Sequence, residues 1–398
     1  MRSFLLFLLF AAPVLAQPAA PPATLEINGA FLVRMKAHPT PAILDAVRSE
    51  ADRMLQVGPF SVMDKKETPP SGSKHDYMSL ATYWWPNPAT KSGLPYIRHD
   101  GETNPQTRDY TDHREINELI SAVHALGLGY YLTGNEAYAA RAVFLLRTWF
   151  LDPATRMNPN LNYAQAVLGV NTGRGTGLID DHDMPQLLDG VTLLSGSPAL
   201  TAPDKAGLRA WFTEYLDWLE TSKNGHAESD ARNNHGSWFD QQIVGIALFL
   251  GKKDLAHKIC ETAETRRIAV QIEPDGSEPL ELVRTKSFSY SAFNLDALCR
   301  LAVEAQRAGV DLWSYKAPDG GSMRGALDFL LPYAQGTKKW THKAINGVDP
   351  HELTEPLLLA AIHYHDAAYL ADAEKFESRP RAGTLLLEEE ARLALAGR

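Results

Sequence analysis

Cysteine is almost absent from this chain, which has two, Cys260 and Cys299, among 398 residues. So low a count excludes a small scaffold stapled by disulfides, and the spacing of the two matches no metal or redox motif. A single disulfide between them stays open, since buried free thiols are equally common in apolar helical segments such as these.

Long hydrophobic runs are also missing, apart from one at the N-terminus. Met1 and Arg2 precede an apolar run and a small-residue cleavage pattern that ends at Ala16, which is typical of a secretory signal peptide. We therefore expect residues 1–16 to be removed and the mature protein to be periplasmic or secreted. No later run approaches the roughly 18 residues that span a bilayer, so we expect no membrane insertion.

Positive charge is in deficit, because 39 Lys and Arg stand against 48 Asp and Glu and give a net charge of −9. This balance argues strongly against nucleic-acid binding. It also suits a polyanionic ligand poorly unless cations converge locally. Candidates for such a local groove are Arg174, Arg232, Arg284 and Lys286.

Strand patterns are scarce as well, whereas helical periodicity recurs along most of the chain. The predicted helices span 41–57, 116–133, 136–151, 184–194, 204–221, 235–250, 255–268, 290–308, 322–333 and 353–369. Helices joined in pairs by uneven loops, without a short repeat, predict an all-α fold: an (α/α) toroid, or incomplete barrel, of helical hairpins with long rim loops. We expect a flexible leader over residues 17–40 and a single domain over 41–398.

One long irregular segment interrupts this helical pattern at about residues 58–112 and is rich in proline. Loops of this length in a compact domain are generally functional. Its aromatic residues, Tyr83, Trp84 and Trp85, offer flat faces on which sugar rings stack, so they are candidate substrate-binding residues. The alternative is a hydrophobic plug that ties the segment to the core.

Two stretches hold the residues best suited to chemistry. The first reads Asn233-Asn234-His235-Gly236-Ser237-Trp238 at a predicted helix start, and the second contains Glu281, Arg284 and Tyr290. His235 carries an imidazole that can accept a proton, Arg284 is a permanent cation, and Tyr290 carries a phenolic proton. A base, a cation and an acid together suit proton abstraction beside a carboxylate.

These stretches resemble the motifs of the alginate lyase superfamily of polysaccharide lyases, Asn-Asn-His-x-x-Trp and Glu-Leu-x-Arg with a later Tyr. The spacing from Arg284 to Tyr290 looks closer to family 38, which acts on alginate or glucuronan, than to the more distant family 5. The resemblance covers roughly residues 75–370 and implies an anionic polyuronate as partner, no cofactor, and a monomer or weak dimer.

The resemblance also implies roles for the central residues in β-elimination. Arg284 and Asn234 neutralise the substrate carboxylate, Arg284 bidentately, so that the C5 proton becomes acidic. His235 then serves as the base and Tyr290 as the acid, although in some relatives the tyrosine does both. Further candidate substrate-binding residues are Asn171, Arg174, Trp238, Lys286 and His351.

Two other classes of function remain alternatives. A toroidal glycoside hydrolase needs two carboxylic acids, for which Asp181, Asp183, Asp240 and Glu281 are candidates. A glycan-binding protein needs only the aromatic platform. The run from Asp180 to Asp183 also invites a metal site, but adjacent side chains point in different directions, so we expect no metal.

Overall fold

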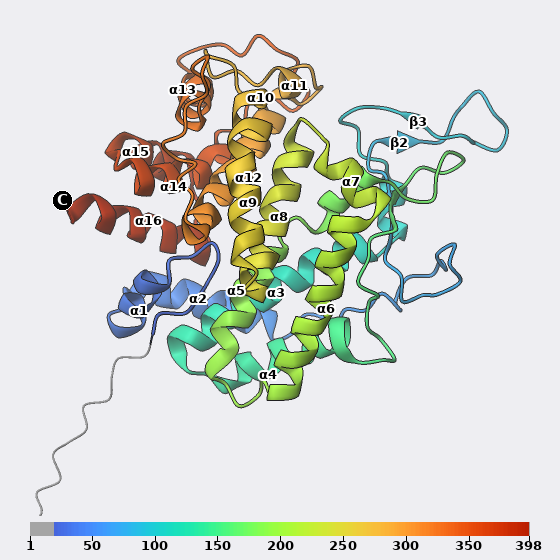
Figure 1. Ribbon diagram of the computed structural model, residues 1–398, viewed down its shortest axis with the longest axis horizontal. Coiled ribbons are helices and arrows are strands. Elements are labelled where there is room, and N and C mark those ends of the chain that lie inside the picture. Colours follow the sequence, from blue (N-terminus) through green and yellow to red (C-terminus); the bar gives the residue numbers. More distant parts are fainter. Residues whose placement is uncertain (1–19, 398) are drawn as a thin grey trace, which may run out of the picture.

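The structure, a computed structural model, describes residues 20–397. It is built almost wholly of helices, which confirms the predicted all-α class (Figure 1). The expected signal peptide over residues 1–16 lies outside the described residues. None of the described helices is long and apolar enough to cross a membrane.

The helices form a closed ring of neighbours, as a toroid requires. Around it, each helix packs on the next and the last returns to the first. The ring runs through α2 (Pro41–Met54), α3 (Asp112–Thr133), α5 (Met184–Leu193), α8 (Asn234–Leu250), α12 (Ser287–Ala308), α14 (Thr354–Tyr364) and α16 (Ala382–Ala396).

The remaining helices pack outside this ring or at its ends. In chain order they are α1 (Gly29–Ala37), α4 (Glu136–Leu146), α6 (Ala202–Thr221), α7 (Lys223–Ser229), α9 (Lys253–Ala263), α10 (Ala269–Gln271), α11 (Pro279–Leu282), α13 (Met323–Ala334) and α15 (Ala367–Phe376). Most of the predicted helices are therefore found, with ends shifted by a few residues. The predicted helix 353–369 is wrong in one respect, because His365, at φ 54°, separates α14 from α15.

Two of the ring helices, α5 and α8, are buried on nearly all sides, and their apolar composition explains this. Almost every side chain of α8 is shielded from solvent, and the helix ends at Gly251, whose left-handed backbone (φ 78°) terminates it without strain. Where α3 crosses α5, Gly127 faces Gly190, and a Cβ at Gly127 would lie 2.7 Å from the Gly190 carbonyl oxygen. The two helices can approach this closely because both positions lack side chains.

Residues 25–37 are held against the helical ring, whereas the sequence predicted a flexible leader over residues 17–40. Backbone N–H groups of Leu25, Glu26 and Ile27 donate to the carboxylate of Asp189 on α5. Helix α1 follows and buries Phe31 among apolar side chains of the neighbouring helices. The prediction treated the whole stretch like its Ala- and Pro-rich first residues. It overlooked the apolar residues that follow them, which pack against the neighbouring helices.

The long segment after α2 forms two small sheets instead of helix. Strand β1 (Met78–Leu80) pairs in parallel with β4 (Tyr163–Ala166), and β2 (Trp84–Trp85) pairs antiparallel with β3 (Ile97–Arg98). In Figure 1, β2 and β3 lie beside the end of the ring at which α12 begins. Residues from the long segment are thereby brought next to the two motifs.

Candidate active site

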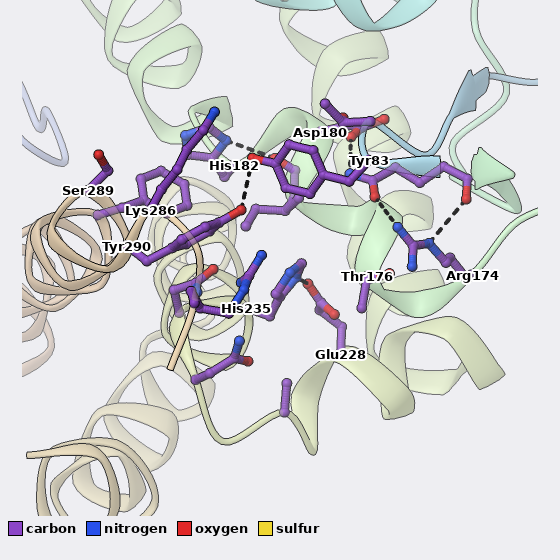
Figure 2. Close-up of a pocket in the computed structure, with 18 of the residues that line it drawn as sticks. Tyr83, Arg174, Thr176, Asp180, His182, Glu228, His235, Lys286, Ser289 and Tyr290 are labelled. Carbon is purple, nitrogen blue, oxygen red and sulfur yellow. Dashed lines mark hydrogen bonds and ion pairs between the residues drawn. The ribbon is translucent and has the colours of Figure 1, made fainter. Parts of the chain in front are cut away.

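A cavity of about 760 Å³ opens at this end of the ring. Its walls come from the long segment, the loop after β4, the end of α7 and the starts of α8 and α12. Figure 2 shows Lys286, Ser289 and Tyr290 on one side, Arg174 and Thr176 on the other, and His235 with Glu228 between them. Both motifs found in the sequence thus face one space.

His235 lies at the start of α8 and is oriented by a buried carboxylate. Its Nδ1 lies 2.6 Å from Oε1 of Glu228, which is on α7 and only 2% exposed. A carboxylate at this distance favours the tautomer with hydrogen on Nδ1, which leaves the lone pair on Nε2. The imidazole of His235 is 19% exposed and lines the cavity, so it is suited to accept a proton there.

Tyr290 stands on the first turns of α12 with its hydroxyl directed at a second tyrosine. Its phenol donates to the phenolic oxygen of Tyr83 at 2.9 Å. Burial raises the pKa of Tyr290, and the neighbouring Tyr83 acts in the same direction, whereas Arg284 opposes both. Tyr290 is therefore a protonated phenol at neutral pH and a potential proton donor.

Arg284 is held between an aromatic ring and a carboxylate. Its guanidinium carbon lies 3.7 Å from the ring centroid of Tyr290, and its Nη2 donates to Asp100 at 2.8 Å. Burial alone would raise the pKa of Asp100, but hydrogen bonds from Arg284 and Thr285 hold it well below the usual range.

This pairing changes the expected role of Arg284. Its Nε also donates to Asp100, at 3.3 Å, so the edge that would bind a substrate carboxylate bidentately is already occupied. The bidentate contact with a substrate carboxylate therefore stays a prediction, and in this structure Asp100 takes the Nε–Nη2 edge. The Nη1 group and the positive charge remain available.

Asn234 is also tied to a carboxylate. Its Nδ2 lies 2.8 Å from both oxygens of Glu281, and its backbone N–H donates to the same group at 2.7 Å. Burial raises the pKa of Glu281, although the hydrogen bonds from Asn234 lower it. Instead of a free amide donor, the structure has an amide fixed between the cavity wall and a buried acid.

Arg174 lines the opposite wall and is held by Gln165. Its Nη2 donates to the Gln165 side chain at 2.7 Å, and Nε donates to the Gln165 carbonyl at 3.2 Å. Gln165 has a positive φ of 48°, a strained conformation for a residue other than glycine. Its amide donates to the buried carboxylate of Asp180 at 2.8 Å, which fixes this conformation.

Four of the predicted site residues lie outside the cavity. Trp238 is 2% exposed and packs edge-on against His182 beneath the site, and Trp85 stacks near His99 while its indole donates to the Glu102 carbonyl. The side chain of Asn171 accepts a hydrogen bond from the backbone N–H of Val167 in its own loop. Exposed His351 forms an ion pair with Glu377 at 2.6 Å. The substrate-binding roles expected for these four residues therefore gain no support from the cavity lining. The predicted residues that do line the cavity are Tyr83, Trp84, Arg174, Asn234, His235, Arg284, Lys286 and Tyr290.

The carboxylates proposed for a hydrolase are all engaged elsewhere. Asp240 forms a buried ion pair with Arg267, Glu281 holds Asn234, and Asp181 accepts from Tyr215 at 2.7 Å. Neither these three nor Asp183 lines the cavity. Among the described residues, no group of three or more His, Cys, Asp or Glu is arranged to hold a metal ion.

Three residues that hold predicted site residues in place were not among the candidates from sequence: Glu228, Asp100 and Gln165. Glu228 lies on α7 and His235 on α8, and Asp100 lies 184 residues before Arg284, so neither contact follows from the pattern of a single helix. Only the positive φ of Gln165 marks that residue as unusual, and this is not visible in sequence. All three act by orienting a residue that the motifs did identify.

Comparison with known proteins shows what this arrangement is similar to. A sequence model of the family described as Alginate lyase matches residues 61–340. No curated protein matches the chain. The chain is similar to the crystal structure of an alginate lyase from Bacteroides ovatus, with 38% identity and a TM-score of 0.86, over 92% of this chain and 98% of that one.

More distant solved structures share the fold. Alginate lyase A1-III from Sphingomonas species A1 has 16% identity and a TM-score of 0.60, over 95% of this chain and 99% of that one. A histidine-to-alanine variant of alginate lyase A1-III, in complex with a tetrasaccharide, has 17% identity and a TM-score of 0.61, over 94% and 97%. At this identity, the likeness supports the toroid fold alone.

Proposed function

Because the chain belongs to the alginate lyase family, and is thus a polysaccharide lyase, we propose that it cleaves the 1,4-linked polyuronate alginate by β-elimination. One observation carries the proposal. A single cavity presents an imidazole oriented by a carboxylate, His235, and a protonated phenol, Tyr290. These two groups supply the base and the acid that the reaction needs.

The first requirement is to make the C5 hydrogen of a uronate acidic. That hydrogen lies beside a carboxylate, whose charge must be balanced as electron density moves onto it. Two cations of the cavity wall can do this: Arg284, which stacks on Tyr290 and keeps Nη1 available, and Lys286, whose ammonium lies 5.7 Å from the ring centroid of Tyr83. Asn234, held by Glu281, completes this wall as a fixed polar contact.

Proton abstraction is the role proposed for His235. With hydrogen on Nδ1 donated to Glu228, Nε2 is the free basic nitrogen. When it takes the C5 proton, the imidazolium that forms lies 2.6 Å from a carboxylate that stabilises its charge. The C5–H electron pair passes into the substrate carboxyl group as an enolate-like intermediate.

Tyr290 then protonates the leaving group. The electron pair forms the C4–C5 double bond, the C4–O4 bond breaks, and O4 receives the phenolic proton of Tyr290. The raised pKa of Tyr290 supports the role of acid over that of base. Tyr83, hydrogen-bonded to Tyr290, is placed to stabilise the phenolate that remains.

Neighbouring sugars are bound by the opposite wall in this proposal. Arg174, aligned by Gln165, offers a second cation for an adjacent carboxylate. Trp84 is half-buried and lines the cavity while it packs against the small apolar cluster of Ala81 and Tyr96. It thus serves both as sugar platform and as plug, the two interpretations that the sequence left open.

We further propose that the enzyme acts outside the cytoplasm, as the N-terminal sequence predicts. A polymeric substrate is reached only after export, which fits a secretory signal over residues 1–16. Cell fractionation with N-terminal sequencing tests this. A mature chain that begins at Gln17 in the periplasm or medium is expected, and an uncleaved cytoplasmic chain would contradict it.

The activity is tested by ultraviolet absorbance of the new conjugated double bond. Purified enzyme is incubated separately with polymannuronate, polyguluronate and glucuronan, in parallel with Tyr290→Phe and His235→Ala. We expect the signal to rise with at least one alginate block and to fall by a hundredfold or more in each variant.

A reducing-end assay on the same samples separates the alternatives. New reducing ends without the absorbance change would replace elimination by hydrolysis. A signal confined to glucuronan would keep the mechanism and change the polymer. Full activity of His235→Ala would transfer the base role to Tyr290.

A further inference from the structure

The loop between α13 and α14 carries an unusual concentration of positive charge. Lys338, Lys339, His342 and Lys343, here called the cationic rim, are all exposed. No Asp or Glu occurs between Asp328 and Asp349. Within residues 20–397, the side chains of the three lysines make no ion pair or hydrogen bond with the protein.

The cationic rim is attached directly to the active-site wall. Lys286, which lines the cavity, forms an antiparallel β-bridge with Ala344. The Ser287 backbone N–H donates to the Lys343 carbonyl at 3.1 Å, and the Trp340 indole donates to the Ser287 hydroxyl at 2.9 Å. The loop is thereby fixed to the first residues of α12, close to Tyr290.

These contacts place the positive charges in a row that begins at the cavity wall. Lys286 lies in the cavity wall, its bridge partner Ala344 lies on the loop, and Lys343 comes next to Ala344. Lys338 and Lys339 continue this charge toward the end of α13. In Figure 1 the loop crosses the same end of the molecule as α11 and faces the side of β2 and β3.

A cluster of cations with no Asp or Glu close to it in the sequence stands out on a chain whose net charge is −9. Some other surface cations are paired with carboxylates, as Arg324 is with Asp366 and Arg392 with Glu374. Lysine is a flexible, strongly hydrated point charge, suited to hold carboxylates whose exact positions vary along a polymer. A local cationic strip on an acidic protein also steers a polyanion toward the site.

We propose that the cationic rim is an extended subsite that binds uronate carboxylates of the same polymer chain beyond those held in the cavity. This inference rests on the proposed function of the site. The cationic rim should therefore increase the affinity for long chains only, because long chains reach the rim whereas short oligosaccharides end inside the cavity. Exposed ion pairs are individually weak, so the gain in affinity for a long polymer comes from several of them acting together.

The test is a triple substitution, Lys338→Gln, Lys339→Gln and Lys343→Gln. A control carries Lys253→Gln, Lys258→Gln and Lys375→Gln, which remove the same charge from exposed lysines of α9 and α15. Affinities for a long polymannuronate and for its trisaccharide are measured by calorimetry at low and high salt. Every protein also carries Tyr290→Phe, so that binding is read without turnover.

We expect the rim variant to bind the long chain roughly fivefold more weakly or worse at low salt, with a smaller salt dependence. Its affinity for the trisaccharide and the affinities of the control should not change. Equal losses for both ligands, or no loss for the long chain, would overturn the proposal. If the wild-type enzyme shows no elimination but the length-dependent loss persists, the proposed reaction fails and the subsite stands.

Discussion

The phenolic oxygens of Tyr290 and Tyr83 lie 2.9 Å apart, although 207 positions separate the two residues in the chain. Tyr290 belongs to α12, whereas Tyr83 belongs to the long segment beside β2. The proposed acid is therefore paired with a residue from a different part of the fold. Under the proposed mechanism, this relationship would give Tyr83 a role in proton transfer as well as in sugar contact.

Replacing Tyr83 by Phe keeps the ring and removes the hydroxyl. We expect kcat to fall about tenfold to a hundredfold with KM little changed, since Tyr290 loses the group that stabilises its phenolate. Initial rates of double-bond formation on a saturating polymer measure this. A rise in KM at constant kcat would show that Tyr83 acts only as a substrate platform.

Glu228→Gln tests how far His235 depends on its carboxylate partner. The amide can still accept a hydrogen bond, but it cannot stabilise an imidazolium, so we expect kcat/KM to fall by a hundredfold or more. The matched control is Asp230→Asn, two residues further on and outside the cavity wall. Unchanged kcat/KM in Glu228→Gln would remove His235 from the role of base.

Arg284→Lys keeps the positive charge but loses the planar fork and its stacking on Tyr290. A single ammonium cannot both pair with Asp100 and reach the substrate, so we expect kcat/KM to fall about a hundredfold. Adding Asp100→Asn frees that ammonium and should restore part of the loss. If the double variant is no better than the single one, the stacking on Tyr290 is what matters.

Asp181 makes folding stability depend on pH. Burial raises its pKa to about 7, while hydrogen bonds from Tyr215 and Gln242 act against the rise. The folded state therefore holds a proton that the unfolded state releases near pH 4, and the stability gained from this is lost as pH rises from about 4 to about 7.

Asp181→Asn removes this dependence. Relative to wild type, the variant should gain stability as the pH rises through that window, by up to about 4 kcal/mol. Urea denaturation at pH 5, 6 and 8 measures the difference. A constant difference across these pH values would show that Asp181 is ionised throughout.

The toroid was predictable because its helices are long, apolar and periodic. The strongest pattern, ending at Gly251, gave α8 to within one residue. The ordered N-terminal segment was missed because its docking depends on Asp189, whose carboxylate collects three backbone N–H groups from 162 to 164 residues away. Local patterns contain no trace of such a contact.

In the site, too, local patterns revealed some residues, whereas contacts between distant parts of the chain were missed. His235, Arg284 and Tyr290 were identified because their residue types and spacing form recognisable motifs. Two of the partners that set their geometry were not identified, since Glu228 and Asp100 reach them only through the fold, and Tyr83 was expected only as a sugar platform. The motifs thus pointed to the candidate reacting groups but gave no sign that Nε and Nη2 of Arg284 and the side-chain amide of Asn234 are held by carboxylates.

The two cysteines have a practical consequence. Cys260 on α9 and Cys299 on α12 are free thiols enclosed in the core, and burial raises the pKa of each well above its usual value. Thiolate, the reactive form, is therefore scarce at both positions. The fold needs no oxidant to form its covalent structure, so a recombinant chain that begins at Gln17 and is made in a reducing cytoplasm should have the same thiols as one matured under oxidising conditions.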